Sequence, residues 1–331
     1  MRCAIVDDYQ DVALAMADWA GLADRVEVRA HSRHLASVDE LVDAVRDCQI
    51  LVIMRERTPF PAEVFARLPE LRLLVTSGMR NASIDLAAAA ESGVTVCGTG
   101  SDSTPPAELT WTLILGLARN IGVEATQLRA NGPWQSTVGT TLAGKTLGLL
   151  GFGKIGVAVG RVGKAFGMDV LAWSQNLTEE RTSAEGVRRA ASKAELLRAS
   201  DVLSVHLVLS DRTRGLLGAD DLALLRPSAL LVNTSRAAII DQDALVDALR
   251  QGRIAGAGLD VFEQEPMPAE HPFRALPTVL ATPHLGYVTD TNYRAYFGEA
   301  VEDIAAYLAG APIRELVGGP ILGQRVVLSD R

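Results

Sequence analysis

Residues 145–156 read KTLGLLGFGKIG, an apolar run that leads directly into the glycine pattern GxGxxG. The three glycines are Gly151, Gly153 and Gly156, and a helical pattern follows over residues 157–166. In this arrangement the first glycine permits a tight turn, the second lets the backbone approach a pyrophosphate, and the third lets helix and strand pack closely. The stretch therefore predicts a dinucleotide-binding unit, with a purely structural glycine turn as the alternative.

Short apolar runs alternate with longer helical patterns on both sides of this stretch. One helical pattern is VDELVDAVRD at residues 38–47, whose apolar residues recur at intervals of three and four. Apolar runs without in-and-out alternation are typical of parallel strands covered by helices on both faces. The pattern predicts an α/β fold with two doubly wound parallel sheets. The expected strands are residues 4–6, 26–28, 50–53, 73–75 and 94–97, and then 147–150, 170–173, 202–206, 230–233, 257–261 and 279–281.

A cluster of turn-forming residues separates the two series of strands. Residues 98–106 (GTGSDSTPP) form this cluster, and a long helical pattern follows over residues 107–120. A length of 331 residues is also more typical of two domains than of one. Because the helical pattern at 290–308 comes after the second sheet is complete, we expect it to cross back to the first domain. The expected domains are residues 1–100 with 288–331, and residues 101–287.

Composition and charge narrow the class of protein. The chain has 32 basic and 40 acidic residues, and the net charge of −8 argues against a nucleic-acid or anionic-membrane surface. No apolar run approaches the roughly 18 residues of a membrane span, and the N-terminus has no apolar signal region. Cys3, Cys48 and Cys97 form no metal-binding pattern and are expected to pack as small hydrophobic residues. We expect a cytoplasmic protein with no metal, nucleic-acid or membrane partner.

Charged side chains follow three successive strands of the second series. Arg236 comes after the run LLVNTS, Glu265 lies in GLDVFEQEP, and His284 lies in ATPHLG. The carboxyl ends of parallel strands meet at one edge of a sheet, where ligands bind in open α/β folds. An arginine there can hold a carboxylate, and a carboxylate with a histidine can move a proton. Taken singly, Arg236 could cap a strand end and His284 could be structural. His206, at another strand end, is interpreted as architectural.

The residues after the second strand of the dinucleotide-binding unit bear on the choice of cofactor. That strand end usually carries Asp or Glu, which binds the ribose hydroxyls. Here the strand is followed by Ser174, Gln175 and Asn176, so no carboxylate stands there. A serine can bond a ribose hydroxyl or a phosphate oxygen, but it does not repel a 2′-phosphate. The cofactor is therefore predicted to be NAD or NADP, and use of both is expected.

Five motifs occur in series along the chain, namely GKTLGLLGFGKIG, VHLVL, LLVNTSRAAIID, AGLDVFEQEP and ATPHLG. In this order and spacing they resemble the D-isomer-specific 2-hydroxyacid dehydrogenase family, and LRLLVTSGMRNASID extends the resemblance into the first domain. The resemblance implies a Rossmann cofactor domain inserted in a flavodoxin-like substrate domain, and usually a homodimer. The implied activity is NAD(P)-dependent interconversion of a small 2-keto acid and its D-2-hydroxy acid, as in glyoxylate and hydroxypyruvate reductases and phosphoglycerate dehydrogenases. The alternative is a dinucleotide-sensing corepressor or scaffold on the same fold.

The resemblance also implies roles for individual residues. Arg236 would bind the substrate carboxylate and polarise the carbonyl, and His284 would protonate the carbonyl oxygen as hydride arrives. Glu265 would pair with His284 and stabilise its imidazolium form. The backbone at Met79 and Arg80 matches the loop that receives the substrate carboxylate. The implied cofactor-binding residues are Gly151, Gly153, Lys154, Ile155, Gly156, Ser174, Leu207, Thr234, Ser235, Asp260 and Gly286, with Asp260 at the nicotinamide end.

Several positions depart from the pattern of the family. Ala237 and Val208 replace a usual glycine and proline, and they are expected only to adjust the backbone. Arg80 and Tyr287 stand where small residues are common, and the sequence leaves open whether they reshape the substrate pocket, with a solvated loop side chain as the alternative for Arg80. Formate dehydrogenases of the family carry Gln at the position of Glu265, because oxidation of formate releases no proton to a base. The glutamate therefore favours reduction of a 2-keto acid.

Overall fold

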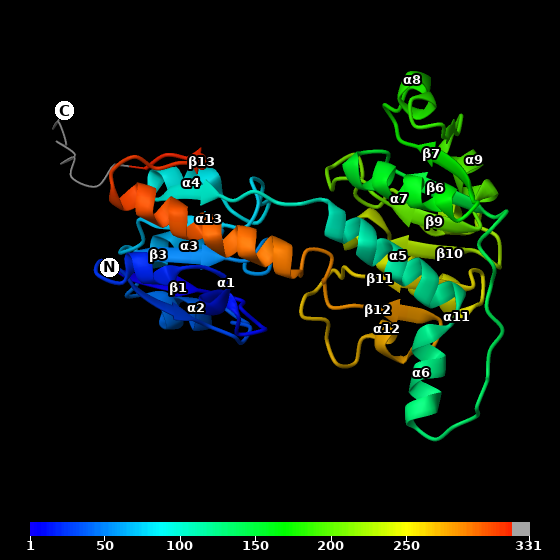
Figure 1. Ribbon diagram of the computed structural model, residues 1–331, viewed down its shortest axis with the longest axis horizontal. Helices are drawn as coiled ribbons and strands as arrows, with labels where there is room; N and C mark the ends of the chain where they lie inside the picture. The colour runs from blue at the N-terminus through cyan, green and yellow to red at the C-terminus, as the bar shows by residue number, and fades with distance from the viewer. Residues whose placement is uncertain (320–331) are drawn as a thin grey trace. The chain divides into compact units, whose positions relative to one another are not determined.

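The computed structural model describes residues 1–319, and the chain divides into two compact units. The first unit comprises Met1–Asp102 and the described residues from Thr289 on, and the second comprises Ser103–Val288. Residues 320–331, the end of the predicted segment 288–331, lie outside the described residues. Each unit is described below by itself (Figure 1).

The first unit contains a six-stranded sheet in the order β13-β5-β4-β3-β1-β2. Strands β1 to β5 are parallel and lie in the flavodoxin-like order 2-1-3-4-5, whereas β13 pairs antiparallel with β5. Every residue of β3, β4 and β5 is buried, which explains why these strands are mainly apolar in the sequence. The strands are β1 Arg2–Ile5, β2 Glu27–Ala30, β3 Ile50–Ile53, β4 Leu73–Thr76, β5 Thr95–Gly98 and β13 Glu315–Val317.

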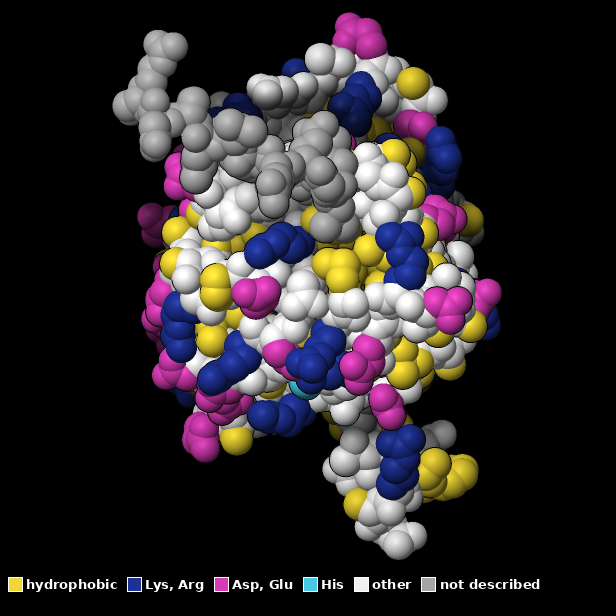
Figure 2. Space-filling model, turned by 90° about the vertical axis from the view of Figure 1, so that its left-hand side faces the viewer, with side chains coloured by type: hydrophobic (Ala, Val, Ile, Leu, Met, Phe, Trp, Pro, Cys, Tyr) yellow, Lys and Arg dark blue, Asp and Glu magenta, His cyan; other side chains and the backbone are white. Residues whose placement is uncertain are grey.

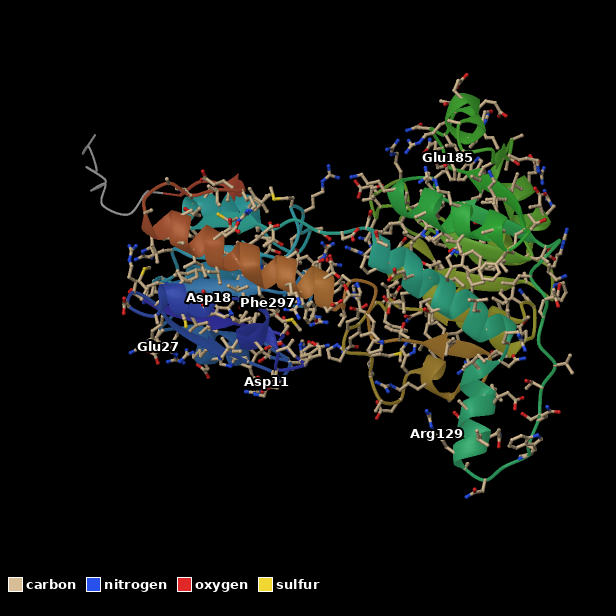
Figure 3. The ribbon with its side chains drawn as sticks, in the orientation of Figure 1. Asp11, Asp18, Glu27, Arg129, Glu185 and Phe297 are labelled. Atoms are coloured by element: carbon tan, nitrogen blue, oxygen red, sulfur yellow. The ribbon has the colours of Figure 1, made fainter. Side chains whose placement is uncertain are left out.

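Helices cover the first sheet, and the last of them comes from the far end of the chain. Helix α13, Asp290–Leu308, packs on α1 and β4 and buries Tyr296, Phe297 and Tyr307 (Figures 1 and 3). Beyond α13, Arg314 Nε donates to Asp303 Oδ1 at 2.9 Å and so ties β13 to this helix. The other helices of the unit are α1 Ala13–Met16, η1 Trp19–Leu22, α2 Val38–Val45, α3 Ala62–Arg67 and α4 Leu86–Glu91.

The second unit contains a seven-stranded, fully parallel sheet in the order β12-β11-β10-β9-β6-β7-β8. Counted along the chain from β6 as the first strand, this is the Rossmann order 3-2-1-4-5-6 with one further strand. From β6 to β8 strands are added on one side of β6, and from β9 on they are added on the other side, so the winding reverses between β6 and β9. Ligands bind at such a reversal, outside the carboxyl ends of the strands. The strands are β6 Thr146–Leu150, β7 Asp169–Trp173, β8 Arg188–Arg189, β9 Val202–Val205, β10 Leu230–Asn233, β11 Gly256–Leu259 and β12 Val279–Ala281.

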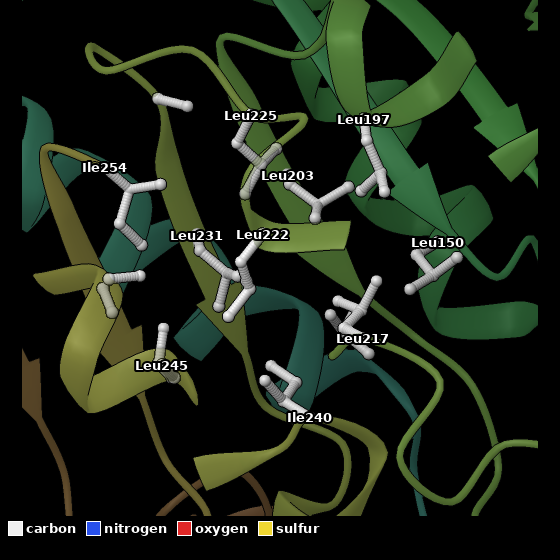
Figure 4. Packing of buried hydrophobic residues seen from close by; sticks show 14 of the residues in the cluster. Leu150, Leu197, Leu203, Leu217, Leu222, Leu225, Leu231, Ile240, Leu245 and Ile254 are labelled. Carbon is white, nitrogen blue, oxygen red and sulfur yellow. The ribbon is translucent and has the colours of Figure 1, made fainter. Parts of the chain in front are cut away.

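Two apolar clusters lie on the two faces of the second sheet. One packs β9 and β10 against α9, α10 and α11 through residues that include Leu197, Leu222 and Leu245 (Figure 4). The other packs the sheet against α5 and α7 and includes Trp111 and Val159. The helices of the unit are α5 Thr104–Ala118, α6 Ile121–Arg129, α7 Lys154–Ala165, α8 Glu179–Ser183, α9 Lys193–Ala199, α10 Ala219–Leu222, η2 Ala237–Ile239, α11 Gln242–Arg250 and α12 Pro272–Ala275.

The predicted fold class, two doubly wound parallel sheets, is confirmed. Three expected strands end earlier than predicted, β1 at Ile5, β9 at Val205 and β11 at Leu259. For β9 and β11 the next residue is polar, His206 and Asp260, and the chain leaves the sheet there. The three cysteines are unpaired and buried, and burial raises the pKa of the Cys97 thiol to about 12. Over residues 1–319, no helix is both long and apolar enough to cross a bilayer. The face shown in Figure 2 carries basic and acidic side chains interspersed.

Candidate active site

The glycine turn after β6 has the geometry that the sequence predicts. Gly151 has φ +105°, and a Cβ added there would lie 2.5 Å from the carbonyl oxygen of His206. A Cβ on Gly156 would lie 2.4 Å from the carbonyl oxygen of Gly151. Gly153, in contrast, has no heavy atom within 4 Å of its added Cβ. Packing therefore requires glycine at the first and third positions, whereas the second leaves an open approach to the backbone.

Helix α7 begins directly after this turn, at Lys154. No side chain caps its first N–H groups, because the residue at the N-cap is Gly153. These N–H groups and the positive end of a 12-residue helix dipole suit a pyrophosphate. The open glycine and the uncapped helix start together fit the phosphates of a dinucleotide.

The end of β7 carries no carboxylate. Ser174 is half-buried, and Gln175 and Asn176 are exposed. The nearest arginines of the neighbouring strand β8 are paired elsewhere, Arg188 with Asp169 and Arg189 with Glu179. The predicted use of both NAD and NADP is neither supported nor contradicted by these contacts, and it stays a prediction.

His206 follows β9 and contacts the glycine turn. Its Nε2 lies 2.8 Å from Ser204 Oγ, and its backbone faces Gly151. Burial lowers the pKa of His206 to about 3, so the imidazole stays neutral near pH 7. This contact pattern is that of an architectural histidine, as the sequence indicates.

Glu265 and His284 lie in direct contact beyond β11 and β12. Glu265 Oε2 is 2.6 Å from Nδ1 of His284, and the other carboxylate oxygen accepts a hydrogen bond from the Phe262 N–H at 2.9 Å. Both carboxylate oxygens are therefore engaged, and the carboxylate cannot rotate without breaking one of the two bonds. The side chains of His284 and Glu265 are 18% and 27% exposed. The arrangement leaves Nε2 as the imidazole nitrogen that is available for proton transfer.

Asp260 organises the loop that carries His284. Its Oδ1 accepts from Thr282 Oγ1 and from the Leu285 N–H, both at 2.7 Å, and its Oδ2 accepts from the Gly286 N–H at 2.8 Å. The side chain is fully buried, and burial raises the pKa of Asp260 while these hydrogen bonds and the nearby His284 oppose the shift. The sequence assigned Asp260 only to the nicotinamide. Its hold on the loop was missed, because no motif spacing reports which backbone groups fold over a carboxylate.

Arg236 is placed by a tight turn after β10. The buried side chain of Asn233 holds this turn through two hydrogen bonds. Its Nδ2 donates to the carbonyl of Arg236 and its Oδ1 accepts from the Ser235 N–H, both at 3.0 Å. Ser235 Oγ donates to the Val205 carbonyl at 2.7 Å, which anchors the turn to β9. Thr234 Oγ1 lies 2.8 Å from Thr110 Oγ1 on α5. Sequence reasoning did not single out Asn233, although an amide at the end of the apolar run LLVN is a detectable signal.

The three strands β10, β11 and β12 are neighbours in the sheet, so Arg236, Asp260 and His284 follow strand ends at one edge. Of the predicted acid/base residues, the structure brings Glu265 and His284 into contact. Within residues 1–319, no group of three or more His, Cys, Asp or Glu side chains could hold a metal ion.

Met79 and Arg80 belong to the first unit, where they follow β4. Both are exposed, and the preceding Gly78 has φ +86°. The Gly78 N–H donates to Thr99 Oγ1 at 3.0 Å, and the Arg55 guanidinium covers the position of its missing Cβ. The loop thus lies at the carboxyl edge of the first sheet, and its role in substrate binding stays a prediction.

A parallel sheet with a glycine turn where its winding reverses, and a hydrogen-bonded carboxylate–histidine pair beyond neighbouring strands, is typical of nucleotide-dependent oxidoreductases. Residues 111–286 match the family model described as D-isomer specific 2-hydroxyacid dehydrogenase, NAD binding domain. The chain belongs to this family, and it is a D-2-hydroxyacid dehydrogenase whose cofactor is NAD(P).

Relatives and solved structures agree with this assignment. The chain is 38% identical to a glyoxylate reductase of Aeropyrum pernix, over 80% of this chain and 81% of that protein. It is 34% identical to a hydroxypyruvate reductase of Thermotoga maritima, over 86% of this chain and 92% of that protein. The crystal structure of a phosphoglycerate oxidoreductase from Vibrio cholerae superposes with a TM-score of 0.90 at 36% identity, covering 94% of this chain and all of that one (100%).

Proposed function

We propose that the protein reduces a small 2-keto acid to the D-2-hydroxy acid with hydride from NADH or NADPH. The observation that carries this proposal is the Glu265–His284 pair, 2.6 Å from Nδ1 to Oε2, at the same sheet edge as Arg236. Glyoxylate and hydroxypyruvate are the first substrates to test, because two of the compared relatives bear these names. The relatives compared are named as reductases and oxidoreductases, which favours an enzyme over a dinucleotide sensor.

Arg236 binds the substrate in this proposal. Its planar guanidinium pairs with the carboxylate through two parallel hydrogen bonds and polarises the adjacent carbonyl. As negative charge develops on the carbonyl oxygen, the same cation stabilises it. Asn233 supports this role by holding the turn on which Arg236 stands.

His284 supplies the proton. A bound NADH or NADPH would supply the hydride for the carbonyl carbon, and His284 Nε2–H donates its proton to the carbonyl oxygen, which gives the alcohol. Glu265 stabilises the imidazolium before transfer and keeps Nδ1 protonated afterwards. The imidazole regains a proton from solvent before the next turnover.

The cofactor site follows from the glycine turn and the end of β7. Backbone groups of Gly153, Lys154 and Ile155 at the start of α7 bind the pyrophosphate in this proposal. Ser174 bonds the adenosine ribose, and no carboxylate there repels a 2′-phosphate, so both nucleotides serve. Leu207, Thr234, Ser235, Asp260 and Gly286 remain proposed cofactor contacts, and Met79 and Arg80 remain proposed substrate contacts.

The test is a panel of 2-keto acids with purified protein. The oxidation of NADH and of NADPH is measured as the loss of nicotinamide absorbance. Turnover of at least one keto acid, lost in Arg236→Ala while NADH still binds in a fluorescence titration, supports the proposal. Nucleotide binding without turnover of any keto acid would favour a sensor instead.

We also propose that the protein is a homodimer, and that α6 with residues 130–141 contributes to the interface. Helix α6 has no buried residue, and it ends at Arg129 (Figure 3). The segment beyond it is held by Glu124, which accepts from Ser136 and Thr137, yet Trp134 and Val138 are 82% and 94% exposed. Exposed large apolar side chains on one segment mark an interaction surface.

Light scattering after size-exclusion chromatography tests the dimer. A Trp134→Ser, Val138→Ser double variant should shift towards the monomer, whereas Leu14→Ser, which removes an exposed leucine of the first unit, should not. A wild-type monomer would refute the proposal.

The three unpaired cysteines also support a reducing, cytoplasmic location, which we propose on that basis.

A further inference from the structure

The loop after β12 holds the backbone of His284 in a conformation that few non-glycine residues adopt. His284 has φ +54°, in the left-handed region, and its N–H donates to the Thr282 carbonyl at 2.9 Å. Hydrogen bonds from Thr282, Leu285 and Gly286 to the Asp260 carboxylate hold the loop on both sides of the histidine. The fold itself therefore sets the position of the His284 Cα–Cβ bond.

The imidazole ring needs a further constraint. The hydrogen bond from Nδ1 to Glu265 Oε2 fixes one ring atom at 2.6 Å from its partner. A histidine ring turns about two side-chain torsions, and the second torsion is broad rather than confined to narrow wells. One hydrogen bond leaves the ring free to tilt about the line that joins the two atoms. A tilt of this kind moves Nε2, the atom that transfers the proton.

Tyr287 supplies a second contact to the same ring. The centroids of the His284 and Tyr287 rings are 5.4 Å apart, and their planes meet at 73° in an edge-to-face arrangement. Tyr287 is 6% exposed, so its own ring has little freedom to swing away. Its backbone lies in the same ordered loop, where the next residue, Val288, donates to the Leu285 carbonyl at 2.9 Å.

We propose that Tyr287 is a positioning residue, whose ring sets the plane of the His284 imidazole and so gives Nε2 a single direction. The inference rests on the proposed role of His284 in proton transfer. Glu265 and Tyr287 then divide the task, because the carboxylate anchors one atom of the imidazole and the aromatic ring fixes its tilt. A tyrosine that only fills space in the loop would affect folding and cofactor binding but not the orientation of the imidazole.

Three variants separate these roles. Tyr287→Leu removes the aromatic ring at similar volume, Tyr287→Phe keeps the ring, and Tyr287→Met is a second variant without a ring in case the leucine protein does not fold. We expect Tyr287→Leu to lower kcat about 3- to 10-fold, the range to which one aromatic pair corresponds, with KM and the Kd for NADH within about twofold. The solvent deuterium isotope effect on kcat should rise, because proton transfer becomes slower. Tyr287→Phe should restore both values.

A readout that does not depend on turnover completes the test. With ring-labelled histidine, the five histidines of the chain are followed by NMR, and His284 is identified by its absence in His284→Asn. The loss of the tyrosine ring current shifts the His284 resonances by itself, so the readout is their line width, which should broaden in Tyr287→Leu and stay as in the wild type in Tyr287→Phe. Unchanged His284 line widths in the leucine variant would overturn the proposal. Loss of NADH binding together with kcat, in both ring-less variants, would make Tyr287 structural and would also overturn it.

The two possible failures can be told apart. If the wild-type protein reduces no keto acid, the proposed function fails, and the NMR comparison still decides whether Tyr287 orients the imidazole. If the wild-type protein is active and the leucine variant matches it in kcat and isotope effect, only the role of Tyr287 fails.

Discussion

Replacing Glu265 by glutamine tests the acid/base pair most directly. Each carboxylate oxygen accepts one hydrogen bond, Oε2 from Nδ1–H of His284 and Oε1 from the Phe262 N–H. Glutamine has one oxygen and one NH₂ group, so it can accept from only one of these donors. Either the Phe262 bond is lost, or the NH₂ group faces Nδ1 and disfavours a proton there. Both outcomes, together with the loss of the negative charge, destabilise the imidazolium form of His284.

The size of the effect follows from the distance and the exposure of the pair. Two charges about 4 Å apart interact by ~4 kcal/mol at an effective dielectric constant of ~20. Because 18% and 27% of the two side chains are exposed, water screens part of this energy, and ~1.5–3 kcal/mol is typical of a hydrogen bond to a charged group. A neutral hydrogen bond retains about 1 kcal/mol of it. The net loss of ~0.5–2 kcal/mol corresponds to a shift of ~0.4–1.5 pH units.

The assay is the pH dependence of kcat/KM for reduction of the keto acid. Reduction requires the protonated imidazole, so the rate falls as pH rises, and the midpoint of this fall should move to lower pH by about one unit in Glu265→Gln. Glu263→Gln is the matched control, since it removes the same charge from an exposed side chain two residues away. A Glu265→Gln profile that superimposes on the wild-type profile, or an equal shift in Glu263→Gln, would refute the pairing.

Three further substitutions test the remaining parts of the site. Arg236→Ala should lower kcat/KM for the keto acid by about 10²–10⁴-fold in steady-state kinetics, and the Kd for NADH should stay within a few-fold in a fluorescence titration; comparable loss of both would make Arg236 a cofactor or structural residue. Ser174→Asp should raise KM for NADPH strongly and leave KM for NADH unchanged or lower, whereas a wild-type protein that already rejects NADPH would place the discrimination elsewhere. His206→Gln should weaken the acid sensitivity of folding. The pKa of His206 is about 3 in the fold against an ordinary 6.5, so His206 has no effect on stability well above pH 6.5, and its protonation in the unfolded chain lowers stability by about 2 kcal/mol at pH 5. Urea unfolding at pH 5 and pH 7 measures this cost, and an equal pH dependence in both proteins would contradict it.

The central strands could be predicted because burial leaves a signature in the sequence. The strands β3, β4, β9 and β10 are buried at every position, so each consists mainly of apolar residues. The two strands that the sequence did not predict, β8 and β13, lie at sheet edges and contain Arg188, Arg189 and Glu315. Edge strands have one open side and tolerate charge, so they lack the apolar pattern that identifies a central strand.

The sequence predicted which residues of the site follow strand ends, but not the contacts that position them. Topology alone brings the ends of β10, β11 and β12 to one edge, so the residues that follow these strands could be grouped from the sequence. The left-handed backbone of His284 and the hydrogen bond from Asn233 to the Arg236 carbonyl depend on which groups pack nearby. Contacts of that kind arise from the tertiary fold and have no fixed spacing along the chain.

The two carboxylates at this edge have different roles because their surroundings differ. Asp260 is fully buried, and its carboxylate accepts hydrogen bonds from two backbone N–H groups and a hydroxyl. These hydrogen bonds hold the loop that carries His284. Glu265 is partly exposed, and its Oε2 lies 2.6 Å from Nδ1 of His284, so in the proposed function it acts directly on the imidazole. We therefore expect that removing Asp260 disturbs where the His284 loop lies, whereas removing Glu265 removes the hydrogen-bond partner of the imidazole itself. The same functional group thus makes different contacts at the two positions, because the protein environment differs.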